Sequence, residues 1–493
     1  MMRSPVSPQP ATLSPRDVRA IMVGLMLAQM LAALDTTIVG PAMSTIGRDL
    51  GDYQHLPWIV TAYLLVSTTL TPLYGKLSDI HGRRVLLLIA IGSFVAGSIA
   101  CALARSMIFL AFARGFQGVG GAGITAMTMT IMGDVIAPRE RPKYQLYLSV
   151  VWITANLAGP ALGGYIAGWL HWSLIFWINV PLGIAAWIVT SGRLKSMPRH
   201  ERPHRLDLIG ALLLMIASAL AMLGLSWGGQ RYGWTSPRIL GLFGASGVAW
   251  SLLVWRQLTA DEPLIPLTVL SNRVVLAGAL ATGFTMASYL GLAIYAPIYF
   301  QTVVGLSVAM AGLATMPLML GTTLTAALSV RVMNRVERYW NLPRLGLAIA
   351  MLSALALSFA SPGWPLLARE LPMALVSLGV GPIFPVINVS VQAAVPPHEL
   401  GTSMSLLTFL RNIGAAVGVA VFGAIVIGGV ATGLAGAGPA TGAATAPLAA
   451  SATFHTVFLV AAMGFAVAFA CLAGVKEPPL KTKRAPEEMV AVD

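Results

Sequence analysis

The sequence predicts an all-α integral membrane protein, and three observations support this fold class. Hydrophobic residues make up 57% of the 493-residue chain and charged residues only 10%, which is more apolar surface than a soluble core needs. The apolar residues gather in windows of about twenty residues, the length at which a helix crosses a bilayer. The basic residues, which give a net charge of +13, lie in short segments between these windows and form no continuous face for nucleic acid.

Fourteen apolar windows can be recognised in chain order. They lie near residues 18–40, 57–75, 85–104, 107–132, 144–168, 172–191, 207–227, 237–256, 274–300, 308–330, 343–360, 366–391, 403–428 and 453–474. Each is long enough to span a membrane as one helix. The uncharged Gly/Ala-rich run 428–450 is predicted to be a flexible outer loop.

The placement of Lys and Arg predicts the orientation of these spans. Of the 31 basic residues, only Arg48, Arg105, Arg231 and Arg238 fall in outer segments when the N-terminus is inside. Arg114, Arg369 and Arg411 fall within spans, and all others fall in inner segments. Positive residues favour the cytoplasmic side, so both termini are predicted to be cytoplasmic.

The domain organisation follows from the largest inner basic segment, which runs from Arg193 to Arg205 and contains two prolines. It is predicted to separate two six-helix halves, an internal duplication that is common in transporters. We expect a cytoplasmic tail (1–17), an N-terminal six-helix bundle (18–200), an inserted two-helix linker (201–262), a C-terminal six-helix bundle (263–475) and a second cytoplasmic tail (476–493).

Neither a metal site nor an enzyme is indicated by the sequence. The only cysteines, Cys101 and Cys471, lie in apolar runs far apart in the chain and are interpreted as small packing residues. No Ser/His/Asp or His/Glu spacing indicates hydrolysis. We therefore expect no enzymatic activity and no cofactor.

The segment from Gly75 to Arg84, GKLSDIHGRR, lies between two apolar runs that must be antiparallel neighbours. It resembles the signature of the major facilitator superfamily in the loop between helices 2 and 3. GPALGG, from Gly159 to Gly164, resembles the antiporter motif of the same superfamily, although Ala155 stands where that motif usually has glycine. The segment around 330–338 is a degenerate copy of the first signature.

Further matches resemble the fourteen-helix drug:proton antiporters of the QacA/EmrB type. They are LDTTIV at Leu34, WIVTAYLL at Trp58, RGFQG at Arg114, FWINVPLG at Phe176 and YFQ at Tyr299, the last with Gly305. This resemblance implies a major facilitator fold with two six-helix bundles and two extra helices. It also implies export of amphiphilic drugs or metabolites in exchange for protons, with the proton gradient as the energy source.

Asp35 is the sharpest functional candidate, because a carboxylate at the centre of a spanning helix costs roughly 2.5–3.5 kcal/mol on insertion scales. Small residues share its helix face, so it is predicted to face protein. Arg114 is predicted to be its partner, since the two residues lie at similar depths from the outer side. The pair is interpreted as the proton-coupling site, and a fixed ion pair without a transport role is the alternative. Glu370, beside Arg369, is a second acidic candidate, for which a local pair is preferred.

The turn from Gly75 to Arg84 is predicted to act as an inner gate. Arg83 or Arg84 could pair with Asp134, and Asp79 could meet the positive helix end near Thr402 and Ser403. The glycines Gly75 and Gly82 permit the tight turn, while Lys76 mainly orients the chain. The alternative is that these charges serve topology only.

The remaining candidate residues have structural or binding roles. Gly159, Pro160, Gly163 and Gly164 are expected to provide close packing and a bend. Aromatic and amide side chains suit lipophilic, often cationic ligands, and those nominated for a substrate path are Trp58, Tyr63, Gln117, Asn156, Tyr295, Tyr299, Gln301 and Asn388.

The function expected from these features is a multidrug efflux antiporter in a bacterial inner or plasma membrane. The alternatives are a dedicated exporter of one endogenous compound, or a transporter-like sensor or lipid flippase without proton coupling. Its expected partners are the lipid bilayer, a small amphiphilic substrate and protons, without nucleic acid. It is expected to work as a monomer or with a periplasmic adaptor and an outer-membrane channel.

Overall fold

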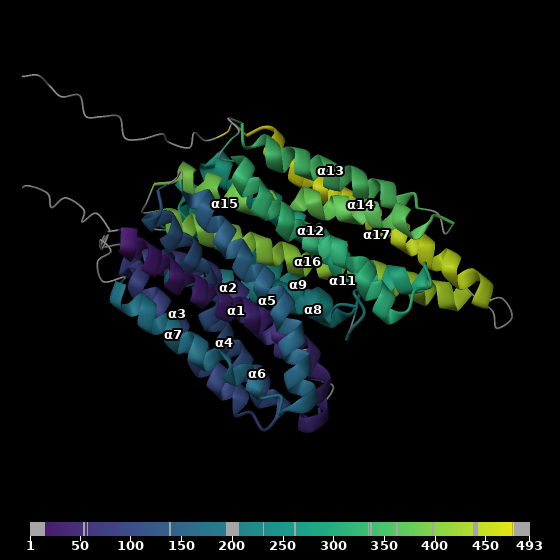
Figure 1. Cartoon of the computed structure of the whole chain (residues 1–493), viewed down its shortest axis with the longest axis horizontal. Helices are drawn as coiled ribbons and strands as arrows, with labels where there is room; N and C mark the ends of the chain where they lie inside the picture. The colour runs from purple at the N-terminus through teal and green to yellow at the C-terminus, as the bar shows by residue number, and fades with distance from the viewer. Residues whose placement is uncertain are drawn as a thin grey trace, which may run out of the picture. The chain divides into compact units, whose positions relative to one another are not determined.

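The computed structural model is built from helices whose order follows the apolar windows (Figure 1). It describes residues 15–52, 55–56, 58–137, 140–193, 207–229, 231–260, 263–333, 335, 338–360, 363–396, 399–436, 442–475 and 477. The residues 334 and 337 of the degenerate signature and most of both predicted tails lie outside these ranges.

The helices of the first half match the first six predicted spans. They are α1 (Pro15–Leu50), α2 (Trp58–His81), α3 (Arg83–Ala102), α4 (Met107–Val135), α5 (Arg141–Trp169), and the pair α6 (Leu174–Trp177) and α7 (Asn179–Arg193). The first helix continues ten residues beyond the predicted end of its span, so Arg48 lies on it.

The helices of the second half match the other eight spans, apart from the short α10 (Leu267–Ser271), which precedes the ninth span. They are α8 (Leu208–Trp227), α9 (Pro237–Thr259), α10 (Leu267–Ser271), α11 (Arg273–Thr302), α12 (Val308–Met333), α13 (Asn341–Ser358), α14 (Leu366–Val380), α15 (Ile383–Ala394), α16 (Leu400–Gly436) and α17 (Gly442–Ala473). The segments α14 and α15 together form one span.

Thirteen of these segments are long and apolar enough to cross a membrane. Helix α2 is less apolar because its middle contains four buried hydroxyl residues, Ser67, Thr68, Thr69 and Thr71. At about 1.5 Å per residue its 24 residues still exceed the thickness of a bilayer core. We therefore count α2 as the fourteenth span.

The prediction of a flexible loop over 428–450 is wrong for most of that run. Helix α16 continues to Gly436 and α17 already begins at Gly442, with residues 437–441 outside the described ranges. Alanine has the highest helix propensity, and no charged residue interrupts the run. Glycine content alone therefore did not indicate a loop here.

Local signals explain several helix starts. The side chain of Ser106 caps α4 by accepting from Phe109 N at 3.3 Å. Asn272 caps α11 by accepting from Val274 N at 3.0 Å. Ser236 caps α9 by accepting from Ile239 N at 3.4 Å, and Pro237 occupies the first turn. These caps satisfy backbone donors that a helix leaves unpaired at its N-terminus.

The helices pack as two units. The first unit contains α1, α3, α4, α6 and α7, most of α2, and α5 from Thr154 onward. Within it, α4 packs on α3, and α1 contacts both α4 and α7. The second unit contains α8 to α17 with Thr68–Leu73 of α2 and Ala137–Ile153, and its centre is α11, which packs against α16 and α17.

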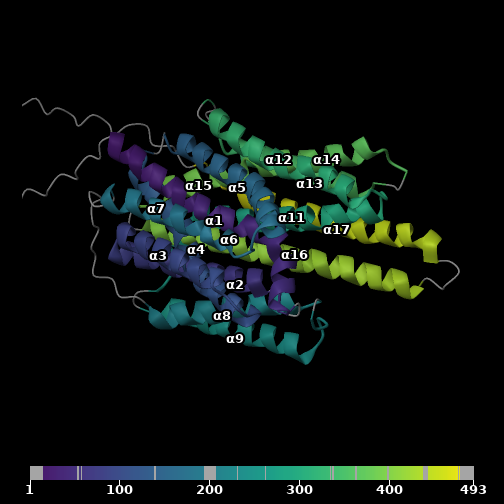
Figure 2. The same ribbon diagram turned by 60° about the horizontal axis from the view of Figure 1, so that its bottom comes forward.

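Helices α8 and α9 form a hairpin in the second unit and lie side by side in both views (Figure 2). Ser246 Oγ donates to the Ala217 carbonyl at 2.7 Å across the hairpin. Arg256 Nε pairs with Asp207 Oδ1 at 3.1 Å, and the same oxygen caps α8 by accepting from Gly210 N. Helix α8 also contacts α16.

Candidate functional site

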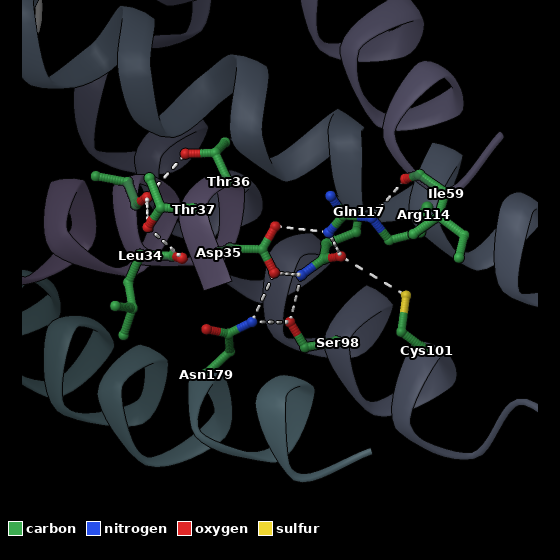
Figure 3. A network of polar contacts seen from close by, with 11 residues as sticks. Leu34, Asp35, Thr36, Thr37, Ile59, Ser98, Cys101, Arg114, Gln117 and Asn179 are labelled. Carbon is green, nitrogen blue, oxygen red and sulfur yellow. Dashed lines mark hydrogen bonds and ion pairs between the residues drawn. The ribbon is translucent and has the colours of Figure 1, made fainter. Parts of the chain in front are cut away.

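Asp35 lies in α1 with no exposed surface and receives three hydrogen bonds (Figure 3). Arg114 Nη1 of α4 donates to Oδ2 at 2.6 Å. Gln117 Nε2 of α4 and Asn179 Nδ2 of α7 each donate to Oδ1 at 2.9 Å. The ion pair predicted from the sequence is therefore present, and it is held by two amides as well as by one guanidinium.

The guanidinium of Arg114 is only 1% exposed and is bound on several sides. Its Nε donates to the Ile59 carbonyl of α2 at 2.9 Å, and Nη1 also donates to Gln117 Oε1 at 2.7 Å. Its central carbon lies 4.5 Å from the centre of the Tyr63 ring and 5.8 Å from that of Phe176. Ring faces attract cations, so the aromatic side chains stabilise this charge away from water.

A second layer of polar groups surrounds the two amides (Figure 3). Ser98 Oγ of α3 accepts from Gln117 Nε2 at 2.7 Å and from Asn179 Nδ2 at 3.3 Å. The Cys101 thiol lies 3.6 Å from Gln117 Oε1 and donates to it. All these side chains are fully buried.

Sequence reasoning missed Ser98, Cys101 and Asn179 as members of this network. Asn179 carried a usable signal, because it is an amide within an apolar span and belongs to the motif quoted at Phe176. Ser98 carried none, since a single serine in an apolar helix commonly bonds to its own backbone. Cys101 was interpreted as a packing residue only.

Glycines allow the helices to approach closely enough for this network to form. A Cβ added at Gly97 of α3 would lie 2.6 Å from Gln117 Cα, and one added at Gly118 of α4 would lie 2.7 Å from the Tyr63 carbonyl. Both distances are too short for a side chain. Any larger residue would therefore push α4 away from α3 or α2 and lengthen the bonds to Asp35 and Arg114.

The network holds one carboxylate and one guanidinium in a water-excluded environment. Each charge is costly there unless it is paired and hydrogen-bonded. A proton on Asp35 would cancel its charge and leave Arg114 without a counter-ion, while the amide donors would face a weaker acceptor. The arrangement is therefore one in which a single proton changes the stability of contacts among α1, α4 and α7.

The glycines of the predicted antiporter motif bring α5 against α1 next to Asp35. A Cβ added at Gly159 would collide with the Thr37 hydroxyl, and one added at Gly163 would collide with the Ile38 carbonyl. Thr37 Oγ1 also donates to the Ala155 carbonyl at 2.9 Å. Ala155, which replaces the glycine usual in this motif, is thus fully buried, and its backbone carbonyl takes part in the contact between α5 and α1.

The other two motif residues behave differently. Pro160 is exposed, and a Cβ at Gly164 would meet nothing within 4 Å in the described part of the chain. The expectation of close packing is therefore wrong for Gly164, because it lies on the side of α5 that faces away from α1.

The turn between α2 and α3 forms a compact ionic cluster in the first unit. Arg83 Nη1 pairs with Asp79 Oδ1, and Arg83 Nε pairs with Asp134 Oδ2 of α4 at 2.9 Å. Nη1 also donates to Ser78 Oγ at 2.8 Å. Gly82 adopts a φ of 88°, in the left-handed region that favours glycine.

Of the two arginines considered for Asp134, Arg83 makes the pair. Arg84 instead uses Nε to donate to the Ser191 carbonyl of α7 at 3.2 Å. Gly75 is buried, and its carbonyl accepts from Ser78 Oγ at 2.8 Å. Lys76 is 8% exposed, so it is more enclosed than a residue that only orients the chain would need to be.

The residues nominated for a substrate path do not form one group. Tyr63 and Gln117 belong to the buried Asp35–Arg114 network and are not open to a ligand in this structure. In the first unit, Trp58 is half-buried at the start of α2, and Asn156 is exposed on α5.

The nominated residues of the second unit also differ in their exposure. Tyr299 is 2% exposed and packs against Phe300, Phe454 and Phe458, with ring centres 5.1–5.4 Å apart. Its aromatic ring is therefore a packing element. Asn388 is 7% exposed, and Gln301 is half-buried. Tyr295 is half-buried and donates to the Val419 carbonyl at 3.3 Å.

The second acidic candidate lies near the start of α14. Glu370 is half-buried, whereas its neighbour Arg369 is only 1% exposed. The Arg369 guanidinium interacts with the Tyr299 hydroxyl of α11. Arg369 therefore points into the second unit. The expectation of a local pair with Glu370 at the membrane edge did not include this contact.

The sequence is similar to those of known transporters over most of its length. It is 32% identical over 415 residues to the uncharacterized MFS-type transporter Rv1877 of Mycobacterium tuberculosis, covering 84% of this chain and 60% of that protein. It is 31% identical over 407 residues to the multidrug transporter protein MdtP of Bacillus subtilis, covering 82% of this chain and 74% of that protein. The chain thus spans less than two thirds of the length of the M. tuberculosis relative.

Solved structures and a family model agree with this similarity. The proton:xylose symporter XylE superposes with a TM-score of 0.64 at 16% identity, covering 95% of this chain and 98% of that chain. A bacterial homologue of the iron transporter ferroportin gives 0.64 at 13% identity, with coverages of 93% and 98%. Both likenesses concern the fold. The model of the Major Facilitator Superfamily matches residues 25–419, and the chain therefore belongs to the major facilitator superfamily of membrane transporters.

Proposed function

We propose that this protein is a proton-driven secondary transporter of the fourteen-helix drug:proton antiporter type, which exports amphiphilic drugs or metabolites from the cytoplasm. The observation that carries this proposal is the fully buried pair of Asp35 and Arg114. A membrane-embedded carboxylate is costly and rarely persists without a function.

In the proposed cycle, Asp35 exchanges a proton with the outside medium. While Asp35 is ionised, its bonds to Arg114, Gln117 and Asn179 hold α1, α4 and α7 together. Protonation removes the charge that holds these donors, so the packing of the three helices is weakened. A ligand can shift a conformational equilibrium only through such a difference between states, and here the ligand is a proton.

The contact between α5 and α1 passes this change to a second helix. Gly159 and Gly163 pack against Thr37 and Ile38, which follow Asp35 by two and three residues. Contacts as close as these leave little room for independent movement. A rearrangement around Asp35 therefore moves α5 as well.

The ionic cluster of Arg83, Asp79 and Asp134 is proposed to stabilise the closed inner side. Its side chains are between 7% and 18% exposed. Partly buried pairs are screened less by salt than surface pairs and contribute more to stability. All three residues belong to the first unit, so the proposed role requires that opening moves the turn between α2 and α3 relative to α4 within this unit.

The names of several relatives support export as the direction of transport. MdtP and multidrug resistance protein 3 of Bacillus subtilis are named for multidrug transport or resistance, and a protein of Dothistroma septosporum is named efflux pump dotC. We propose a bacterial inner or plasma membrane as the location, with both termini in the cytoplasm. Export of one endogenous compound would use the same machinery.

A susceptibility panel in an efflux-deficient bacterial host tests the function. Cells that produce the wild-type protein should tolerate several amphiphilic compounds at least fourfold better than cells with Asp35→Asn. Asn retains the size of the side chain and removes its charge, and immunoblots should confirm equal amounts of both proteins. Equal tolerance with both proteins to every compound that the wild type exports would contradict the role of Asp35.

A further inference from the structure

Arg411 lies near the middle of the membrane in the second unit. It is the twelfth residue of α16, within a candidate span from Leu400 to Val426. At 1.5 Å per residue, its Cα lies about 16 Å along the axis from the start of the span. The centre of a bilayer is the most costly place for a guanidinium, so a residue there calls for a binding partner.

The position of Arg411 on its helix directs it toward protein. Gly414 and Gly418 lie three and seven residues further along α16 and share its face. Added Cβ atoms at these glycines would collide with the carbonyls of Gly283 and Ala287 in α11. Arg411 therefore lies on the side of α16 that packs on α11, the central helix of this unit, and not on a lipid-facing side.

The Arg411 side chain is half-buried and retains accessible surface. A half-buried guanidinium keeps surface that a ligand can contact, whereas a fully buried one has none to offer. Arg114 illustrates the contrast, since it is 1% exposed and fully occupied by Asp35, Gln117 and a backbone carbonyl.

No carboxylate neutralises Arg411 in the part of the chain that the structure describes. Among helices α11 to α17, only α14 contains an acidic residue, Glu370, and it lies in the first turns of that helix. Glu399 precedes α16 and accepts from the Thr268 hydroxyl at 2.6 Å, and it lies about 18 Å along the helix axis from Arg411.

We propose that Arg411 binds the acidic group of the transported substrate, and that the preferred substrates are amphiphilic organic acids with a carboxylate. This inference rests on the proposed export function and names its substrate class. A guanidinium binds a carboxylate through two parallel hydrogen bonds, and such a pair is strong where water is scarce. Each ligand would supply the negative charge that the surrounding helices lack. Neutral or cationic amphiphiles would leave Arg411 uncompensated.

Three pyrene compounds that differ in charge provide the test. They are pyrenebutyrate, its neutral amide and the cationic pyrenebutylamine, and their export is followed by fluorescence in everted membrane vesicles. The wild type should export the acid with a KM at least tenfold lower than that of the amide. Arg411→Gln should raise the KM for the acid at least tenfold and change that for the amide less than twofold.

Two further variants separate binding from folding. Arg411→Lys keeps the charge but loses the paired geometry, so the preference for the acid should persist with a KM raised severalfold. Arg331→Gln, which removes an exposed arginine in the last turn of α12, should leave all three KM values unchanged. Two results would overturn the inference and leave the proposed function standing. One is that Arg411→Gln still prefers the acid, and the other is that the wild type exports the amine but not the acid. Export of none of the three compounds would contradict both the inference and the proposed function.

Discussion

The Thr37 hydroxyl donates a hydrogen bond to the backbone carbonyl of Ala155 at 2.9 Å. Thr37 follows the buried Asp35 by two residues in α1. This bond joins α1 to α5 at the point where the glycines of the antiporter motif make their closest contacts. The proposed proton site and the motif typical of exporters are therefore parts of one structure.

Gly163→Ala should reduce export at least tenfold, whereas Gly164→Ala should leave it nearly unchanged. The new methyl group at Gly163 would collide with the Ile38 backbone, which cannot move away without moving α1. Overpacking of this kind typically costs about 1–3 kcal/mol. The methyl group at Gly164 meets open space. Export in vesicles, normalised to protein amount, measures both, and equal activities would show that the contact between α5 and α1 has no role.

Asn179→Ala should destabilise the protein and impair export. It removes a donor from Asp35 and another from Ser98 within a fully buried network. Loss of such a bond costs about 1–3 kcal/mol. Thermal unfolding in detergent should show a lower midpoint than for the control Ser191→Ala, whose hydroxyl bonds only to its own helix. An unchanged midpoint for Asn179→Ala would mean that the amide does not support Asp35.

Arg83→Gln should impair transport far more than Arg84→Gln. Arg83 is paired with both Asp79 and Asp134, while Arg84 makes a single bond to a backbone carbonyl. Loss of the paired arginine leaves two carboxylates close together without a cation. We expect at least a tenfold loss of export for Arg83→Gln and less than twofold for Arg84→Gln, measured at equal expression. The reverse order would reject the cluster as a gate.

Substitutions at Asp207 should affect the stability of the hairpin of α8 and α9 without affecting export. Asp207→Asn keeps the cap on α8 but removes the ion pair with Arg256, which is partly exposed. This change should cost under about 1 kcal/mol. Asp207→Ala loses the cap as well and should cost about 1 kcal/mol more. Unfolding in detergent measures both, and a loss of export by either folded variant would assign the hairpin a direct part in transport.

Much of the fold could be predicted from the sequence because lipid imposes simple constraints. Every spanning segment must satisfy its own backbone bonds, so apolar windows become helices. Helix α2 was recognisable despite its four hydroxyl residues, since its length and flanking windows still required a span. The helical structure in the run 428–450 contradicts the predicted loop because alanine, which favours helix, outweighs the glycines there.

The candidate site was predictable where charge was involved. Asp35 and Arg114 stand out in apolar helices, and matching depth was enough to pair them. Charge did not mark Ser98, Cys101 or Asn179. The roles of Ser98 and Cys101 depend on α3 meeting Gln117 of α4, and that of Asn179 depends on α7 meeting Asp35 and Ser98. Nor could sequence alone distinguish Gly163 from Gly164, since only the packing of α5 on α1 separates their environments.

The proton-coupling role of Asp35 can be tested most directly by following proton movement in everted vesicles loaded with acid. A pH-sensitive dye reports the gradient, and an exported compound is added from the outside, which corresponds to the cytoplasmic face. With the wild type, the compound should collapse the gradient as protons leave in exchange for it, and vesicles with Asp35→Asn should show no collapse. Equal proton release by both proteins, or transport by the wild type without proton release, would contradict the account.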